Sequence, residues 1–313
     1  GVDIFFAISG FILSSVILRT RPETPRMAGD FMLRRYIRIL PIYWIVSLFP
    51  LVFALVHHTL TAGWLLSSYL LLPSLRYPMP EPLLSVGWTL VFEMFFYYVL
   101  TFNLLFGKRA VIQRSILSIL ILVGIGALAD FHRAVLILVA NPMNIEFVLG
   151  CCTALIYTKF GNRPALGRVL ILLGGLALAS TILFGYGRID DSALTLNGHA
   201  SWQRVIRWGI PAAILTAGFI FRPGEIRSAF GRLWVYLGDA SYSIYLTSVF
   251  TFFLYNRFYH LVAGLPPDLN VFLGVFIVAA IGAATYSFIE RPITQFITAK
   301  YQRRKTHTAL KPA

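Results

Sequence analysis

Apolar residues fill nine windows of the chain, each long enough to cross a lipid bilayer as a helix. An α-helix rises about 1.5 Å per residue, so about 20 apolar residues span the roughly 30 Å hydrocarbon core of a bilayer. The windows fall at residues 3–19, 39–57, 84–106, 112–129, 142–158, 167–185, 206–222, 233–255 and 270–290. The pattern predicts an all-α, polytopic integral membrane protein with about nine transmembrane helices in this chain.

The composition supports this interpretation. Of the 313 residues, 58% are hydrophobic and 13% are charged, and the mean hydropathy is +0.74. These values lie outside the usual range of soluble domains. We expect one membrane domain over residues 1–292, followed by a basic cytoplasmic tail over residues 293–313.

The formal net charge is +14, and the Lys and Arg residues gather in alternate connections and in the tail. Short basic loops face the cytoplasm in membrane proteins, which predicts a cytoplasmic C-terminus and places Gly1 outside. Basic residues so distributed fix orientation and contact membrane lipids, so we expect no nucleic-acid partner. The chain opens at Gly1 inside an apolar run, without a Met or a signal-peptide n-region. We therefore expect one more span upstream, which would make ten.

The window at 84–106 carries a carboxylate, Glu93, near its middle. An acid at bilayer depth is costly and usually faces a protein interior or a wet cavity, so it indicates a functional site. Thr89, Glu93 and Tyr97 recur at i, i+4 and i+8, which places them on one helix face. We predict that this face points to a cavity or to a partner helix. The alternative is a buried Glu that pairs with an Arg to join two helices.

Three arginines, Arg34, Arg35 and Arg38, fall within five residues on the cytoplasmic side of the second window. On a short helix before Pro41 they would form a fork of guanidinium groups, and such groups suit phosphate. They are candidates for a phosphate-bearing ligand. The alternative is a topology signal that contacts anionic headgroups.

Other polar residues lie inside the windows. Glu146 is the second acid at depth, and Asp239 and Tyr245 belong to the polar window 233–255. They are candidates to line a cavity, although polar residues in lipid also join helices. Asp3 is either an interfacial charge favoured by a helix dipole or part of a site. The sequence holds no His/Cys set with metal-ligand spacing, so we predict no metal.

Helix ends and contacts can also be predicted. Gly10 is small enough to let a partner helix approach closely. In the last window we expect Glu290 and Arg291 to form a local ion pair and Pro292 to end the helix.

The segments GVDIFFAISGFI, FMLRRYIRILPIYW, GWTLVFEMFFY, LGDASYSIYLTS and SFIERP follow one another along the chain. In order and spacing this set resembles the membrane acyltransferase family that O-acylates bacterial surface polysaccharides. GWTLVFEMFFY and NPMNIEFVLG are most similar to exopolysaccharide acetyltransferases of the succinoglycan type. The resemblance covers essentially the whole chain.

The resemblance implies a ten-helix enzyme of the bacterial inner membrane that moves an acyl group, acetyl above all, from cytoplasmic acyl-CoA to a sugar hydroxyl. The acceptor would be an exopolysaccharide or its lipid-linked precursor. Arg35 and Arg38 match the family's Arg-x-x-Arg, and Trp88 and Glu93 match its Trp-x-Leu-x-x-Glu. Arg34, Arg35 and Arg38 would then bind the CoA phosphates. Glu93 would orient the base or bind sugar hydroxyls, and Trp88 would stack on a ring.

Two departures from the family pattern affect this expectation. The family's first helix carries a basic residue and, eleven positions later, a His held to be essential. That helix would precede Gly1, so the resemblance implies that this chain by itself lacks the best catalytic candidate and would need it for activity. Ser248 also stands where the family has a His. The main alternative is a transporter or flippase of a lipid-linked glycan, in which Glu93, Glu146 and Asp239 line a path. A non-catalytic membrane scaffold is a third.

Overall fold

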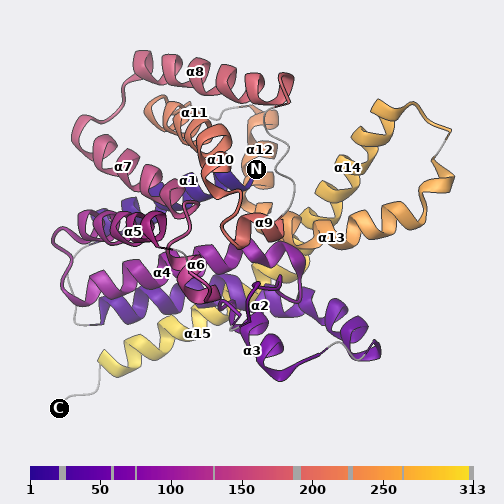
Figure 1. The fold of residues 1–313 in the computed structure, drawn as a ribbon, viewed down its shortest axis with the longest axis horizontal. Coiled ribbons are helices and arrows are strands. Elements are labelled where there is room, and N and C mark those ends of the chain that lie inside the picture. Colours follow the sequence, from indigo (N-terminus) through magenta and orange to yellow (C-terminus); the bar gives the residue numbers. More distant parts are fainter. Residues whose placement is uncertain are drawn as a thin grey trace. The chain divides into compact units, whose positions relative to one another are not determined.

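The computed structural model describes residues 1–20, 26–57, 60–74, 76–129, 131–185, 192–224, 228–262 and 264–309, and these residues form helices and connections without a β-strand. They divide into two compact units. The first unit comprises residues 1–32, 61–82 and 88–225, and the second comprises residues 33–60, 83–87 and 226–313. Figure 1 shows the helices of both units.

The first unit contains the helices that surround Glu93. Its helices are α1 (Val2–Arg19), the start of α2 (Met27–Val56), α3 (Ala62–Leu70), α4 (Trp88–Leu105), α5 (Val111–Leu128), α6 (Ala134–Val139), α7 (Asn144–Phe160), α8 (Pro164–Leu183), α9 (Ser192–Leu196), α10 (Ser201–Arg204) and α11 (Ile210–Phe221). A π-helical turn, Val205–Gly209, joins α10 to α11. The main helix pairs are α1 with α7 and α8 with α11.

The second unit contains the rest of α2 and the C-terminal helices. These are α12 (Ala229–Asp239), α13 (Ser241–Arg257), α14 (Pro267–Thr285) and α15 (Arg291–Ala309), with 3₁₀ turns at Ser85–Gly87 and Tyr259–Leu261. Helices α13 and α14 pack against each other (Figure 1). The predicted tail thus begins as helix α15, and residues 310–313 lie outside the described residues.

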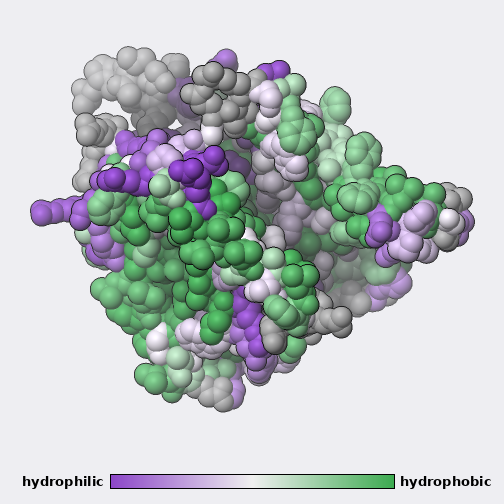
Figure 2. Space-filling model, turned by 90° about the horizontal axis from the view of Figure 1, so that it is seen from above, coloured by the Kyte–Doolittle hydropathy of each residue, from purple (hydrophilic) through white to green (hydrophobic). Residues whose placement is uncertain are grey.

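Eight helical segments among the described residues are long and apolar enough to cross a membrane, and they coincide with eight of the predicted windows. Their outward faces carry large apolar side chains, such as Phe53 at 63% exposure and Phe276 at 70%. Figure 2 shows apolar side chains over much of the visible surface. Lipid favours such surfaces, which would be costly in water. The chain is an all-α, multi-pass membrane protein.

The predicted span at 233–255 is interrupted. Helix α12 ends at Asp239 after 11 residues, and α13 begins at Ser241 and runs for 17 residues. Ala240 between them is fully buried, at φ −81° and ψ −4°. The window was apolar enough to suggest a single span, but Gly238 and Asp239 both favour a helix end, and hydropathy does not register such a break.

Two prolines, Pro41 and Pro292, lie inside helical segments, although Pro292 was predicted to end its helix. Pro41 stands within the single 30-residue helix α2, so the arginines occupy the same helix as the span. Pro292 does not end the last helix, because a π-helical turn, Tyr286–Glu290, leads directly into α15. A wider turn can accommodate a ring that lacks an N–H and crowds the preceding carbonyl.

Two glycines set the separation of α1 and α7. A methyl group on Gly10 would collide with the backbone carbonyl of Phe147, and one on Gly150 would collide with that of Ala7. The prediction that Gly10 permits a close helix contact is therefore confirmed. Without side chains at these two positions, the helix backbones touch directly.

We predict that Gly150→Ala separates α1 from α7 and lowers the free energy of unfolding by about 1–3 kcal/mol, the usual cost of overpacking. Gly175→Ala in α8 is the matched control, because a methyl group there meets no atom within 4 Å. Thermal unfolding of the purified protein in detergent would compare the two. Equal melting temperatures for both variants would contradict the direct backbone contact.

Candidate active site

Aromatic side chains from three helices enclose the middle of the first unit. The ring of Phe6 on α1 stacks on Phe147 of α7 with centroids 4.4 Å apart, and Phe147 stacks on Phe96 of α4 at 4.6 Å. All three rings are fully buried. This stack joins α1, α4 and α7 beside the polar face of α4 and keeps water from its apolar side.

Glu93 lies on that polar face and points toward α1. Its side chain is 5% exposed, and its Oε1 accepts hydrogen bonds from the Tyr97 hydroxyl and, at 3.4 Å, from the Ser9 hydroxyl. Tyr97 is one helical turn further along α4, whereas Ser9 belongs to α1. The polar stripe thus faces a partner helix, as predicted, and two hydroxyl donors act on one carboxylate oxygen. A carboxylate held in this way can accept a proton or orient a neighbouring base.

Thr89 and Trp88 occupy the first turn of α4. Thr89 is 1% exposed and Trp88 is 7% exposed. The Trp88 ring contacts Phe92 edge-on, and the guanidinium of Arg204 lies 5.6 Å from the ring centroid. A cation over an indole face is attracted by the ring quadrupole. Arg204 therefore covers part of the surface that a stacking sugar ring would use.

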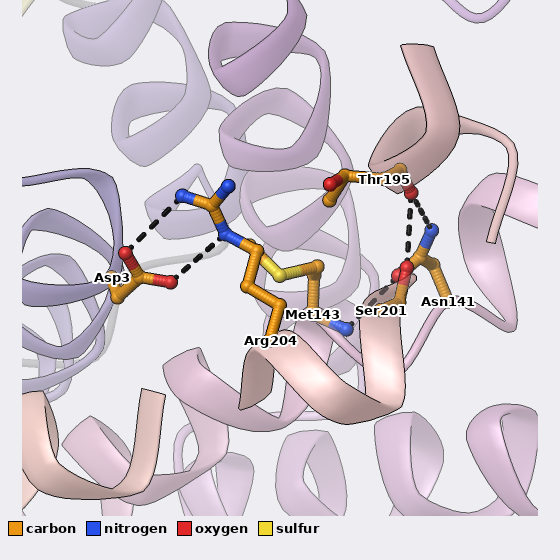
Figure 3. Close-up of polar contacts among 6 residues, drawn as sticks. All are labelled: Asp3, Asn141, Met143, Thr195, Ser201 and Arg204. Carbon is orange, nitrogen blue, oxygen red and sulfur yellow. Dashed lines mark hydrogen bonds and ion pairs between the residues drawn. The ribbon is translucent and has the colours of Figure 1, made fainter. Parts of the chain in front are cut away.

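Arg204 also forms an ion pair with Asp3. Its Nε lies 3.0 Å from Oδ1 of Asp3, and its Nη2 donates a hydrogen bond to Oδ2 at 3.2 Å. Figure 3 shows the two parallel bonds of this fork. The side chains are 14% and 7% exposed. Of the two interpretations of Asp3, the structure supports a buried partner over an interfacial charge, because the fork ties the start of α1 to α10.

Glu146 completes a second polar group, the Arg204 cluster, which we define as Asp3, Glu146 and Arg204. Glu146 is fully buried in the first turn of α7, within hydrogen-bond reach of the Asp3 carboxylate, and its carboxyl oxygens accept no hydrogen bond from the residues that the structure describes. Asp3 and Arg204 are the charged side chains that act on it. Gly209 faces it so closely that a methyl group there would strike the carboxyl. Two buried acids side by side are costly, so the positions of Asp3 and Glu146 depend on the positive charge of Arg204.

The three arginines of α2 lie in the second unit. Arg34 and Arg38 are exposed, and Arg35 is partly buried. Arg38 acts electrostatically on Tyr286 and Glu290. A row of guanidinium groups with two of its members open to solvent suits a phosphate-bearing ligand.

The last helix window holds a different contact from the one predicted. Glu290 is 6% exposed, and its Oε2 accepts a hydrogen bond from the Ser243 hydroxyl at 2.5 Å. Arg291 is exposed and makes no ion pair with it. The expected Glu290–Arg291 pair is therefore wrong, because the π-helical turn directs Glu290 inward to α13.

Asp239 and Tyr245 belong to the second unit, whereas Glu93 belongs to the first. Asp239 ends α12 and is exposed, so it lies on a different helix from Tyr245. Tyr245 donates a hydrogen bond to the Val86 carbonyl at 2.8 Å, and Tyr242 donates to the Ile39 carbonyl at 3.0 Å. These two tyrosines join elements within the second unit, as polar residues in lipid often do.

The predicted residues thus divide between the units. Trp88, Thr89, Glu93, Tyr97 and Glu146 belong to the first, whereas Arg34, Arg35, Arg38, Asp239 and Tyr245 belong to the second. Sequence reasoning missed Ser9 and Arg204 as site residues. Ser9 is a small residue of an apolar window, and Arg204 lies in a polar connection, so no local pattern singles out either one.

Comparison with known proteins connects this geometry to an activity. The family described as "Acyltransferase domain" matches residues 1–288. The chain belongs to this acyltransferase family. It is therefore a membrane O-acyltransferase.

Two relatives of this acyltransferase illustrate the range of the family. The chain is 31% identical over 305 residues to "Exopolysaccharide production protein ExoZ" of Rhizobium meliloti strain 1021. The match covers 94% of this chain and 88% of that protein. The chain is 24% identical over 330 residues to "O-acetyltransferase OatA" of Staphylococcus aureus, covering 94% of this chain but 52% of that protein. No solved structure matches the acyltransferase.

We predict that Arg204→Gln destabilises the protein by about 3–5 kcal/mol, because it leaves the carboxylates of the Arg204 cluster buried without a cation. Combining it with Asp3→Asn should recover part of this loss, since one of the uncompensated charges is then removed. Denaturant titration in mixed micelles measures the free energy of unfolding of the single and double variants. Arg133→Gln, at an exposed position, is the control. Additive effects of the two changes would argue against a coupled pair.

Proposed function

We propose that this acyltransferase takes an acyl group, acetyl above all, from acyl-CoA on the cytoplasmic side of the bacterial inner membrane. The acceptor is a sugar hydroxyl of an exopolysaccharide or of its lipid-linked precursor. Support for the acceptor comes from the names of the relatives, which concern exopolysaccharide production and O-acetyl transfer. The observation that carries the proposal is the buried carboxylate of Glu93 with its two hydroxyl donors.

Acylation of a hydroxyl requires a group that takes the hydroxyl proton and donors that stabilise the oxyanion. Glu93 is buried where water does not compete, and Tyr97 and Ser9 hold its Oε1 in place. From there it can accept the hydrogen bond of the acceptor hydroxyl or orient the base that deprotonates it.

The donor is a thioester joined to a pyrophosphate and a 3′-phosphate. Arg34, Arg35 and Arg38 offer guanidinium groups over little more than one turn of α2, and bidentate contacts to phosphate suit this residue type. The basic connections predicted to be cytoplasmic include this segment. We assign the three arginines to the CoA phosphates, with Arg34 and Arg38 as the two exposed contacts.

We predict that Glu93→Gln lowers acyl transfer by on the order of 10² or more, because the amide keeps the shape but cannot take a proton. The measurement is acetylation of cell-surface polysaccharide in cells that express the full-length protein at wild-type membrane levels. Glu81→Gln is the matched control, since Glu81 bonds to Ser192 away from α4. Near-normal acetylation by Glu93→Gln would make Glu93 a structural residue. If Glu93→Gln stopped glycan export while acetylation persisted, the result would indicate a transporter instead.

We predict that Arg38→Ala weakens binding of acetyl-CoA by about tenfold to a hundredfold, the effect of one lost charge-assisted phosphate contact. Arg38→Lys should restore binding in part, because Lys keeps the charge but not the fork. Equilibrium titration of the protein in nanodiscs with acetyl-CoA provides the affinity, and Arg168→Ala on α8 controls for general charge. Unchanged affinity in Arg35→Ala and Arg38→Ala would leave the arginines as a topology signal.

A further inference from the structure

A cleft of about 270 Å³ opens in the first unit, apart from Glu93. Its wall includes three aromatic side chains, Tyr77, Phe131 and Trp202, and three polar ones, Asn141, Asn197 and His199. These residues come from three connections that the charge pattern places on the outer side of the membrane. None of the described residues that line it is Asp, Glu, Lys or Arg. This part of the lining is therefore suited to a neutral ligand.

The cleft is held in shape by hydrogen bonds between its connections. Nδ2 of Asn141 and the Ser201 hydroxyl both donate to the carbonyl oxygen of Thr195, at 2.9 and 3.0 Å (Figure 3). Oδ1 of Asn197 accepts from the backbone N–H of Met79 at 2.7 Å. The amides thus fix the walls, and a preformed site loses less conformational entropy when a ligand binds.

Close packing and a glycine turn also shape the cleft. At Gly126 near the end of α5, an added methyl group would stand 2.5 Å from Cβ of Ala140, so only a glycine lets these two walls meet. Gly198 has a φ of +86°, which favours glycine and directs the chain from Asn197 to His199. Both glycines therefore help to set the shape of this cleft.

The exposed groups of the cleft match both the apolar C–H face and the polar hydroxyl groups of a sugar ring. Tyr77 and Trp202 are each 45% exposed, and His199 is also exposed. The Tyr77 hydroxyl, the Trp202 indole N–H and the His199 imidazole make no hydrogen bond with other described residues. Aromatic faces receive the apolar C–H face of a pyranose, and these polar groups can bond its hydroxyls. The volume lies just below the usual range of about 300–1,000 Å³ for drug-sized ligands, which suits one ring.

We propose that this cleft is a subsite for one neutral sugar ring of the acceptor glycan, with Trp202 and Tyr77 as the stacking residues. The inference rests on the proposed function, since it names a place where the acceptor is held. Trp202 stands two residues before Arg204 on α10, and Asn141 stands shortly before Glu146.

Saturation-transfer NMR on the full-length protein in nanodiscs tests the subsite without requiring catalysis. The probes are cellotetraose and β-1,4-galactotetraose. We expect transfer to the ring protons of at least one probe, and Trp202→Ala or Tyr77→Ala should weaken its binding by about tenfold. Trp202→Phe should retain most of the binding, and Trp234→Ala, at an exposed indole of the second unit, is the control. A wild-type protein that binds neither probe would overturn the subsite.

Kinetics separates this proposal from the proposed function. With a probe sugar as acceptor, Trp202→Ala should raise the KM for the sugar and leave kcat and the KM for acetyl-CoA nearly unchanged, as expected for a residue that contributes uniform binding. Probe binding without any acyl transfer from acetyl-CoA would contradict the proposed donor and acceptor and leave the subsite standing. Acyl transfer with an unaltered sugar KM in Trp202→Ala and Tyr77→Ala would refute the subsite alone.

Discussion

A carboxylate inside an apolar helical core is stable only where neighbouring groups compensate for the water it has lost. Glu93 meets this condition through the hydroxyls of Tyr97 and Ser9, and the second of these depends on the position of α1. Helix α1 is in turn fixed against α7 by the contact at Gly10 and Gly150. The geometry of the candidate catalytic group therefore depends on a backbone contact between two other helices, where a single added methyl group is too large.

The buried carboxyl groups of the first unit differ in the partners that they have within the protein. The Glu93 carboxyl is bonded to two hydroxyls, Asp3 is paired with Arg204, and Glu146 accepts no hydrogen bond from the residues that the structure describes. The bonded carboxyls are held in a fixed orientation, whereas Glu146, beside Asp3, depends on the charge of Arg204. The arginines of α2 form a separate group in the second unit, open to solvent and suited to phosphate.

Much of the fold could be predicted from the sequence, because the length of an apolar window reflects the thickness of the bilayer that it must cross. The Glu93–Tyr97 contact was also predictable, since residues four apart on a helix are neighbours. The Asp3–Arg204 pair was not, because it joins residues 201 positions apart and no local pattern encodes that distance. The break at Ala240 and the continuation through Pro292 escaped prediction for a related reason: hydropathy measures burial in lipid, whereas these features depend on local backbone geometry.

The most direct test of the account is acyl transfer by the purified wild-type protein in sealed proteoliposomes of known orientation. Radiolabelled acetyl-CoA, which does not cross the bilayer, is supplied from one side, with the polysaccharide acceptor present. The account predicts labelled polysaccharide when acetyl-CoA reaches the face that exposes the C-terminus, and little label when it reaches the opposite face alone. Label that appears equally from both faces, or no label in the polysaccharide from either face, would contradict it.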